Sequence, residues 1–597
     1  IITLWMILLA TKEFSNLGLS QRNIYWINEM YATGGKPLLN LFNTIENIPL
    51  PKWLSTYFRA LSAIFFQDNI LAGFLLSTGI LLYSRIAFSL SFLGFFGAYL
   101  FNDFTGAFQA GINSYHLGSN YMMVAIAIGG FFAIPSVYSF LWAFFSIPIT
   151  NIMVIALSKV FGVFLLPIFS LPFCLMILMY LYFLKMRILP GKLVLTPIQH
   201  YSPEINLYQY KNNNERLKDE YYFKFNLPFI GEWAVSQGYD GSITHKEDWS
   251  KAIDFIILDQ ELKSYLGDGT SLENFYCYNK PVLAPADGYV QEIVDYIDDN
   301  PVGKINRVQN WGNAIVIYHL PGLYSKLAHL KKNSFIVKQG EFVKKGQVLA
   351  YCGNSGRSPE PHLHFQIQSN PYIGSKTMIY PFSYFYQNNG KEISYKTFTV
   401  PQEGTFVSNI EINKLLQQAF SFQPGFSIKM SDGNTEETWE VYTDAYNQTY
   451  ICCKENDAVA YFVNNSAVFY FTSFYGNKQS FLYEFYLSAF KVVLSYIPQI
   501  TIKDAYPLSV VNAPIFKWIQ DFVSPFIQLI KPKYMLNYSH IDDENFTTEI
   551  SLETAMELEV IGQNKVIRTS HIILKNGKIN QITINQTGKE RIIKCQE

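Results

Sequence analysis

Hydrophobic positions divide this 597-residue chain into two unlike parts. Between Asn69 and Leu184 charged residues nearly vanish and apolar side chains form long runs, whereas the remainder mixes polar and apolar positions as soluble domains do. A helix that crosses a ~30 Å hydrocarbon layer needs about 20 apolar residues. The later runs reach that length, and the first two reach it only with their flanks: Ile70–Tyr83, Ile86–Leu100, Tyr121–Phe140, Leu141–Val160 and Phe161–Leu184. The pattern predicts an α-helical, multi-pass membrane domain over residues 1–187.

Two features qualify this membrane domain. Arg85 and Lys159 are the only cations interior to the apolar runs, which disfavours the alternative of buried helices in a large soluble domain. Ile1–Ala10 resembles the end of an apolar helix without an initiator Met or signal peptide, so we expect the sequence to be the later part of a longer chain. Residues 11–65 have the mixed pattern of an amphipathic, interfacial connection.

The pattern changes after the last apolar run. Residues 188–228 are polar and marked by prolines, which predicts a linker. From 229 to 390 short β-type runs alternate with Gly, Asn and Pro turns, and this spacing predicts an all-β domain. Residues 396–597 predict a β-rich (α+β) C-terminal domain of unknown role, with strands such as Ala458–Phe462 and helices at Phe481–Leu494 and Ile515–Ile530. The chain is therefore expected to be multidomain.

Composition adds little beyond this division. Only 16% of the residues are charged and 49% are hydrophobic, against roughly 25% charged in soluble proteins. The net charge of −1 gives no support to a nucleic-acid partner. Six cysteines without a CxxC pair indicate neither a disulfide framework nor a thiolate zinc site.

Five of the nine histidines lie between residues 245 and 364. The clearest group is Pro361-His362-Leu363-His364-Phe365, because residues i and i+2 of a β-strand point to the same face and both imidazoles can enter one site. Asp254 lies in the apolar run Ala252-Ile253-Asp254-Phe255, where a buried carboxylate is costly unless it is paired or bound to a metal. The alternative is an exposed aspartate on an edge strand.

These residues belong to a series of motifs that resembles the lysostaphin-like, or LytM-type, zinc endopeptidases, which cut peptide cross-links in bacterial cell walls. The resemblance covers about 140 residues in the family's order. Its motifs are His245 to Asp254, Val282-Leu283-Ala284-Pro285-Ala286-Asp287-Gly288-Tyr289-Val290, Trp311-Gly312-Asn313-Ala314-Ile315-Val316-Ile317, Leu327-Ala328-His329-Leu330, Gln339-Gly340 through Gly346-Gln347, Gly353-Asn354-Ser355-Gly356 and Pro361-His362-Leu363-His364-Phe365.

The resemblance implies a site with a Zn²⁺ cofactor and named roles. His245, Asp254 and His364 would be the zinc ligands, and His329 and His362 would be catalytic residues that handle protons. His319 receives no role and is interpreted as a structural or surface histidine. Two departures concern the cleft: eight residues separate His245 from Asp254 where the shortest family pattern has three, and the acidic stretch 259–279 precedes the hairpin at Ala284. Either segment is a candidate cover for the site.

The apolar part resembles one repeat of the urea transporter family. The likeness depends on Phe65-Phe66-Gln67-Asp68-Asn69 followed by Gly73, on Gly118-Ser119-Asn120-Tyr121 and on Phe169-Ser170-Leu171-Pro172-Phe173. Members have two inverted repeats, so an earlier repeat is expected upstream of Ile1. Ala63 stands where the family usually has Gln or Glu, and alanine supplies no hydrogen-bond acceptor for a urea slot. A membrane anchor and a functioning channel both stay open.

The sequence thus predicts a membrane-anchored zinc metalloendopeptidase that acts on peptidoglycan. The alternatives are a urea-like solute channel and a structural membrane component whose peptidase-like domain binds partners without cleavage. Expected partners are peptidoglycan peptides, membrane lipid and proteins that bind the C-terminal domain, with no nucleic acid. Lys185, Arg187 and Lys192 favour a cytoplasmic C-terminal side, but Arg22, Lys36, Lys52 and Arg59 balance them. A cell-wall substrate places the soluble domains in the periplasm, with the helices in the bacterial inner membrane.

Overall fold

The computed structural model describes residues 26–65, 69–106, 119–164, 166–187, 192–196, 199, 201–212, 214–496, 500–511, 514–541, 549–586 and 588–596. The apolar stretch Ile1–Ala10, most of the Phe65–Asn69 motif and Gly118 lie outside these residues. The chain forms two compact units. The first contains residues 1–214, 507–531 and 559–563, and the second contains 215–506, 532–558 and 564–597.

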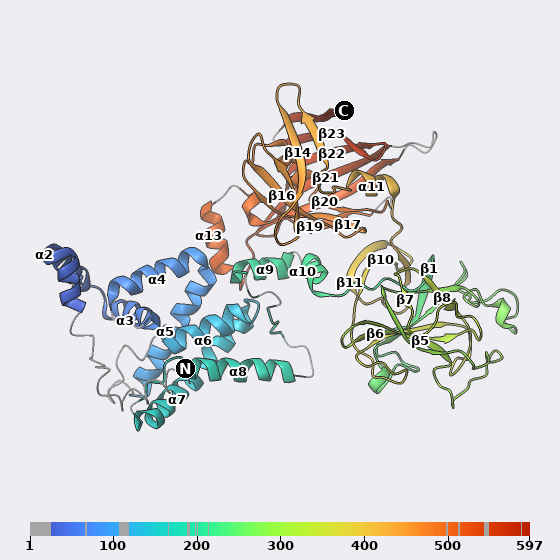
Figure 1. The fold of residues 1–597 in the computed structure, drawn as a ribbon, viewed down its shortest axis with the longest axis horizontal. Coiled ribbons are helices and arrows are strands. Elements are labelled where there is room, and N and C mark those ends of the chain that lie inside the picture. The colour runs from blue at the N-terminus through green and yellow to red at the C-terminus, as the bar shows by residue number, and fades with distance from the viewer. Residues whose placement is uncertain are drawn as a thin grey trace. The chain divides into compact units, whose positions relative to one another are not determined.

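The first unit is helical (Figure 1). Side-chain caps define two of its helix starts: Asn69 accepts a hydrogen bond from the Ala72 amide, and Ser84 accepts one from the Ala87 amide. The helices are α2 (Trp26–Glu46), α3 (Lys52–Ser62), α4 (Ile70–Tyr83), α5 (Arg85–Phe104), α6 (Ser119–Ile126), α7 (Val137–Gly162), α8 (Leu171–Met186), α9 (Pro203–Asn212) and α13 (Pro514–Val523). A π-helical turn, Ala127–Phe131, continues α6.

Among the described residues, α5 and α7 are long and apolar enough to cross a membrane. A third span exists if α3 and α4, bent by 83° at a short break, act as one. The runs expected at Tyr121–Phe140 and Phe161–Leu184 are divided differently, because helix ends fall close to Pro135 and Pro167. Proline disfavours helix in the preceding residue and lacks an amide proton. The apolar helices that result at α6 and α8 are shorter than a full span.

The second unit begins near α10 (Asn214–Tyr221), so α9 and α10 both lie within the expected linker. A ten-stranded sheet follows in the order β11-β10-β12-β1-β2-β9-β6-β5-β4-β7. Its strands are β1 (Glu232–Gln237), β2 (Ala252–Ile256), β4 (Gly288–Val294), β5 (Asn313–Leu320), β6 (Leu323–Leu330), β7 (Phe342–Val343), β9 (Leu363–Gln368), β10 (Phe382–Asn388), β11 (Ile393–Thr399) and β12 (Phe406–Asn409). A separate pair joins β3 (Pro281–Leu283) to β8 (Val348–Tyr351). The all-β fold expected from the sequence is confirmed, and the sheet continues past residue 390.

A twelve-stranded sheet forms the rest of this unit, in the order β18-β17-β16-β15-β14-β13-β24-β23-β22-β21-β20-β19. The expected helix at Phe481–Leu494 ends at Ser488, because Lys491–Val493 forms β18 beside β17. The strands are β13 (Ser427–Ser431), β14 (Glu436–Thr443), β15 (Thr449–Cys453), β16 (Ala458–Asn464), β17 (Val468–Tyr475), β18, β19 (Ile502–Ala505), β20 (Ile530–Ile541), β21 (Glu549–Val560), β22 (Gln563–Lys575), β23 (Lys578–Gln586) and β24 (Lys589–Gln596), with helices α11 (Lys414–Ala419) and α12 (Phe481–Ser488).

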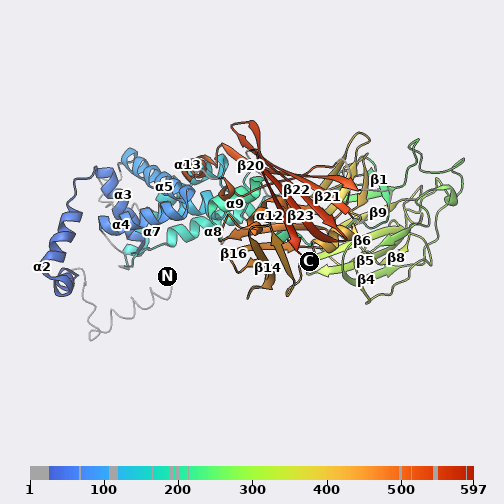
Figure 2. The ribbon, with the colours of Figure 1, turned by 90° about the horizontal axis from the view of Figure 1, so that it is seen from above.

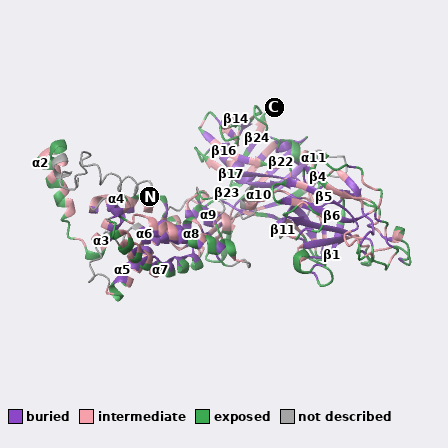
Figure 3. Cartoon of the chain, turned by 60° about the horizontal axis from the view of Figure 1, so that its bottom comes forward, coloured by how far each residue is buried: buried purple, intermediate pink, exposed green. Residues whose placement is uncertain are grey.

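Strand β9 holds the centre of the ten-stranded sheet between β2 and β6, and all six of its residues are buried. Leu363, Phe365 and Ile367 belong to the hydrophobic core of this sheet. Figure 3 shows buried positions along the neighbouring strands β5 and β6. Because side chains alternate along a strand, the other face of β9 presents His364, Gln366 and Gln368. The fold therefore buries a polar row.

Candidate active site

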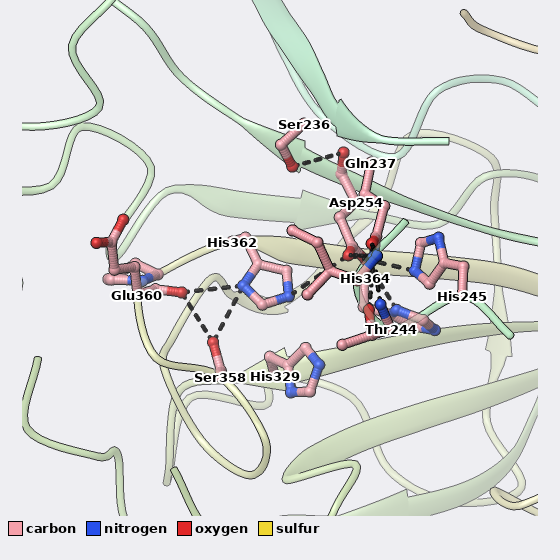
Figure 4. Close-up of polar contacts among 12 residues, drawn as sticks. Ser236, Gln237, Thr244, His245, Asp254, His329, Ser358, Glu360, His362 and His364 are labelled. Carbon is pink, nitrogen blue, oxygen red and sulfur yellow. Dashed lines mark hydrogen bonds and ion pairs between the residues drawn. The ribbon is translucent and has the colours of Figure 1, made fainter. Parts of the chain in front are cut away.

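Strand pairing brings together the residues that the sequence predicts as metal ligands. Asp254 of β2 and His364 of β9 are direct partners in the antiparallel register, so their side chains lie side by side. His245 comes from the segment between β1 and β2, and Figure 4 shows it beside both residues. His364 Nδ1 lies 2.9 Å from Asp254 Oδ1, and His245 Nε2 lies 3.2 Å from Asp254 Oδ2. The three ligand atoms lie within 4.8 Å of one another and their residues are buried.

Hydrogen bonds to the far side of each imidazole fix which nitrogen faces this centre. His245 Nδ1 lies 2.8 Å from the Gly238 carbonyl oxygen. A carbonyl oxygen can only accept a hydrogen bond, so Nδ1 carries the proton and Nε2 carries the lone pair. His364 Nε2 lies 3.1 Å from Gln366 Oε1. The Gln366 amide is oriented by its Nε2, which donates to Gln368 Oε1 at 2.9 Å and to the Ser375 carbonyl at 3.3 Å. His364 Nε2 is therefore the protonated nitrogen, and Nδ1 carries the lone pair.

The three facing groups consequently form a set of electron-pair donors, called the donor set below, with no proton between them. Two imidazole lone pairs meet a carboxylate, and His245 Nε2 is a buried nitrogen without a hydrogen bond among the described residues. Such an arrangement is repulsive by itself and fits a bound cation. Nitrogen and carboxylate ligands, three in number, match the protein ligands of a catalytic zinc site. The residues present therefore fit Zn²⁺.

Gln237 holds the carboxylate in place and is itself held by backbone amides. Gln237 Nε2 donates to Asp254 Oδ2 at 3.0 Å and to Thr244 Oγ1 at 2.6 Å. Its Oε1 accepts from the amides of Ile243 and Thr244, so one side chain links the His245 segment to β2. The hydrogen bond from Gln237 Nε2 stabilises the charged form of this buried carboxylate.

The two remaining histidines lie on one side of this centre. His329 Nδ1 is 2.8 Å from the Ser355 carbonyl oxygen, and His362 Nδ1 is 2.9 Å from the Glu360 carbonyl oxygen. Each ring therefore keeps its lone pair on Nε2. The ring centroids are 4.7 Å apart, and His362 Nε2 lies 4.0 Å from Asp254 Oδ2. Burial, with help from His362 and His364, holds the pKa of His329 well below its ordinary value, so this imidazole is neutral.

A cavity of about 320 Å³ opens over the site. Trp249, from the insertion between His245 and Asp254, lines it together with Trp311, and the two rings meet edge to face at 6.0 Å. Ser264 is the part of the 259–279 stretch that reaches the cavity wall. Both segments named as candidate covers thus border the cleft, and the five histidine and aspartate side chains remain among its lining residues.

His319 is not part of the site. Its Nδ1 lies 2.7 Å from the Asp287 carbonyl oxygen and its Nε2 2.8 Å from Ser325 Oγ, and its ring packs on Phe225. Sequence reasoning missed the orienting residues Gln237 and Gln366. A signal for Gln366 was present, since His362, His364, Gln366 and Gln368 repeat at every second position.

Two family models match the chain. Residues 1–185 match "Urea transporter", and residues 269–374 match "Peptidase family M23". The chain carries a peptidase M23 domain and a urea transporter domain. The M23 match contains His329, His362 and His364, whereas His245 and Asp254 precede it. Both resemblances inferred from the sequence are confirmed.

Curated relatives match within the M23 region. The chain is 39% identical over 90 residues to the DD-carboxypeptidase/endopeptidase Mpg of Neisseria meningitidis serogroup B, covering 15% of this chain and 17% of the relative. It is 43% identical over 69 residues to the peptidoglycan DD-endopeptidase ShyB of Vibrio cholerae, covering 12% and 16%. The chain thus spans about a sixth of the length of these relatives.

Among solved structures, the catalytic domain of lysostaphin from Staphylococcus simulans is 22% identical and aligns with 25% of this chain and 87% of its own, with a TM-score of 0.16.

Proposed function

We propose that this chain is a membrane-anchored zinc endopeptidase that hydrolyses peptide cross-links of bacterial peptidoglycan. The observation that carries the proposal is the donor set of His245, Asp254 and His364, whose lone pairs face one another because the opposite nitrogens are tied to carbonyl oxygens. The M23 match and the named activities of the relatives support the substrate class.

The histidines outside the donor set supply the proton chemistry. Bound zinc lowers the pKa of a coordinated water toward ~7 and polarises a carbonyl oxygen. His329 and His362 are held with Nε2 unprotonated, so either can accept a proton from the attacking water. Once protonated, the same nitrogen donates a hydrogen bond to the developing oxyanion or a proton to the leaving amine. The Ser355 and Glu360 carbonyls keep both rings in the tautomer that this sequence of transfers needs.

Substrate location sets the proposed orientation. Peptidoglycan lies outside the cytoplasmic membrane, so we place the soluble parts in the periplasm and the apolar helices in the inner membrane. Two of the cations after the last apolar helix are engaged within the first unit: Arg187 donates to the Leu193 carbonyl at 2.6 Å, and Lys192 donates to Tyr138 Oη at 2.6 Å. These contacts weaken the charge argument for a cytoplasmic side. A phosphatase reporter fused after Glu597 tests the orientation, and activity of a cytoplasmic reporter would contradict it.

The test of hydrolysis uses the purified full chain in detergent with zinc and isolated cell wall. We expect wild type to release peptide fragments and His364→Ala to release none. His571→Ala is a matched control, since that histidine lies on β22 of the other sheet. If wild type and His364→Ala yield identical products, or if neither binds zinc, the proposal fails. A zinc-loaded wild type that binds peptidoglycan without cleaving it would favour a partner-binding role instead.

The urea transporter match favours a second function, passage of small amides through the membrane unit. Asn120 joins two of the sequence motifs that resemble this family: its Nδ2 donates to the Phe169 carbonyl at 3.0 Å, and its Oδ1 accepts from the Phe173 amide at 3.1 Å. Ala63, by contrast, is buried without any polar group to offer. Urea flux into proteoliposomes above that of empty vesicles would establish a channel, and its absence leaves the unit as an anchor.

A further inference from the structure

Helix α13 belongs to an excursion from the twelve-stranded sheet. The chain leaves the sheet after β19 and returns at β20, and the intervening residues 507–531 group with the helical unit instead of the sheet. Figures 1 and 2 both show α13 beside α5, one of the two helices with the length and composition of a membrane span. A segment of the C-terminal region is thus built into the unit that matches a urea transporter.

The two faces of this excursion are reversed relative to a helix in water. Between Ile515 and Ile527 the buried side chains other than Pro525 are polar: Gln520, Asp521 and Ser524 are at most 1% exposed. Its exposed side chains are apolar, with Ile515 75%, Phe516 62%, Ile519 46%, Phe526 53% and Ile527 53% exposed. A surface helix of a soluble protein buries the apolar stripe and exposes the polar one. The reversed pattern is that of a helix whose outer face meets an apolar medium.

The polar face is held by specific partners at the beginning of α5 and on α9. Asp521 Oδ2 lies 2.7 Å from Arg85 Nη2, and Asp521 Oδ1 accepts from Tyr208 Oη at 2.7 Å. Lys211 of α9 donates to the Ser524 carbonyl at 2.7 Å. Arg85, an interior cation in the sequence, thus finds its counter-charge 436 residues away. This network fixes which face of α13 turns outward.

The apolar face continues a surface that is already apolar. Phe526 packs edge to face on Phe140 of α7 at 5.0 Å, and Phe522 approaches Phe88 of α5 at 6.4 Å. Leu82 and Tyr83 at the end of α4, and Leu141 next to Phe140 on α7, are also exposed. The outward face of α13 is therefore continuous with the side chains that a membrane span presents to lipid.

A second element of this unit has the same character. Residues 559–563 form the tip of the β21–β22 hairpin, and the Ile561 amide donates to the Leu529 carbonyl at 2.9 Å. Ile561 is 74% exposed and has a φ of 50°. Positions with positive φ at a hairpin tip usually carry Gly, Asn or Asp, and an exposed β-branched side chain is disfavoured there. An apolar environment around the tip would stabilise the exposed isoleucine side chain and offset the cost of its backbone conformation.

We propose that residues 514–527, together with the hairpin tip at Ile561, form a membrane-docking element whose apolar face lies among lipid acyl chains at the N-terminal end of α5. The element joins the twelve-stranded sheet to the bilayer by chain connections at both ends of the excursion. An amphipathic helix in the interfacial plane buries its apolar face about 5–10 Å deep, which suits side chains of this size. The C-terminal region gains a role as an anchor for the soluble unit.

The experiment places a photoreactive benzoylphenylalanine at Phe516 of the full chain in phosphatidylcholine–phosphatidylglycerol nanodiscs. We expect lipid adducts by mass spectrometry at Phe516, which is 62% exposed, and none at Tyr446, a still more exposed aromatic control (86%) on the turn between β14 and β15. Cross-links from Phe516 to a second copy of the chain would overturn the proposal in favour of a dimer contact. An absence of both adducts would overturn it in favour of a face in water.

A second measurement covers the case in which the photoreactive variant does not fold. Trp518 lies in α13 with the Arg85 guanidinium 5.5 Å from its ring centroid. Lipids brominated near the headgroup should quench the tryptophan fluorescence of wild type more strongly than that of Trp518→Phe. Equal quenching of the two proteins would contradict insertion of the helix.

Discussion

Strand β9 and helix α13 both bury polar side chains, yet the two clusters differ in how their hydrogen bonds close. On α13 each carboxylate oxygen of Asp521 receives its own donor, from Arg85 and from Tyr208. At β9 the protons of His245 and His364 point away from Asp254, so the centre contains acceptors that face acceptors. The cluster whose carboxylate is closed by two donors fits a structural role, although Arg85 Nε and Gln520 Nε2 have no hydrogen bond among the described residues. The open cluster, whose acceptors face one another, fits a cation and chemistry. Buried polar side chains alone therefore do not identify a metal site. The identifying feature is that the protons of the histidines point away from the acceptors that face one another.

The largest effect that separates the two clusters is expected at the proton-handling histidines. Replacing His329 or His362 by Ala should lower the rate of cell-wall hydrolysis by about 10²–10⁴-fold, because a positioned general acid–base contributes that much. Zinc content should be unchanged, since neither residue belongs to the donor set. Metal analysis and hydrolysis of the same samples check both statements. Loss of zinc in His329→Ala would show that this residue is a ligand instead.

The closed cluster should respond in stability and not in chemistry. Asp521→Asn leaves the partly buried Arg85 without its counter-charge, and breaking a fully buried ion pair costs about 3–5 kcal/mol, which is the upper bound here. We expect faster hydrogen exchange over residues 507–531, while zinc content and hydrolysis per bound zinc stay at the wild-type level. Asn212→Ala, which removes only the acceptor of Gln528 Nε2 at 2.9 Å, is the milder control. Unchanged exchange in Asp521→Asn would show that the ion pair does not hold the helix.

How much of the site could be predicted depends on how far apart along the sequence the interacting residues lie. His362 and His364 are placed together by strand alternation, and Asp254 is recognisable as a carboxylate inside an apolar strand. The Gly238 carbonyl that orients His245 has no side-chain signature, so no pattern reveals it. Arg85 and Asp521 lie too far apart for a single sequence to pair them. For the same reason the stripe at Ile515–Ile530 predicted a helix without showing which face would be buried.

Secondary structure shows a similar limit. The strand predictions around Ala458–Phe462 are confirmed, since alternation is a local property. The helix predicted at Phe481–Leu494 is wrong beyond Ser488, where pairing with β17 outweighs the local pattern. The proposed domain boundaries remain predictions, although the excursion at 507–531 shows that a segment distant in sequence joins the helical unit.

His319 lies outside the site, is buried and has a hydrogen-bond partner for each ring nitrogen. It therefore allows a pH-dependent effect on stability to be compared with the effects on catalysis. Burial lowers its pKa to about 4, against 6.5 for the free side chain. The unfolded chain therefore binds a proton more readily, so stability from the neutral ring is complete above pH 6.5 and is lost as pH falls toward 4. The loss amounts to about 3 kcal/mol. His319→Gln should flatten the thermal stability profile over that range in metal-free protein, and an unaltered profile would contradict the assignment.

Gln366 tests whether the open cluster depends on proton direction. Its Oε1 holds the proton of His364 on Nε2, so Gln366→Met should free that ring to take the other tautomer and rotate. Residues that orient a metal-bound histidine contribute about 10–100-fold in metal affinity, and we expect a loss of that size in zinc titrations. Gln366→Glu keeps an acceptor for His364 but turns a second carboxylate oxygen toward Gln368 Oε1 and the Ser375 carbonyl, so it should retain only part of the affinity. Gln368→Met is the matched control one step further along the relay, where the expected loss is smaller because Gln366 keeps its bond to the Ser375 carbonyl. If all three variants bind zinc as wild type does, the tautomer of His364 is fixed by the metal itself, and the contrast between open and closed clusters reduces to the presence of a cation.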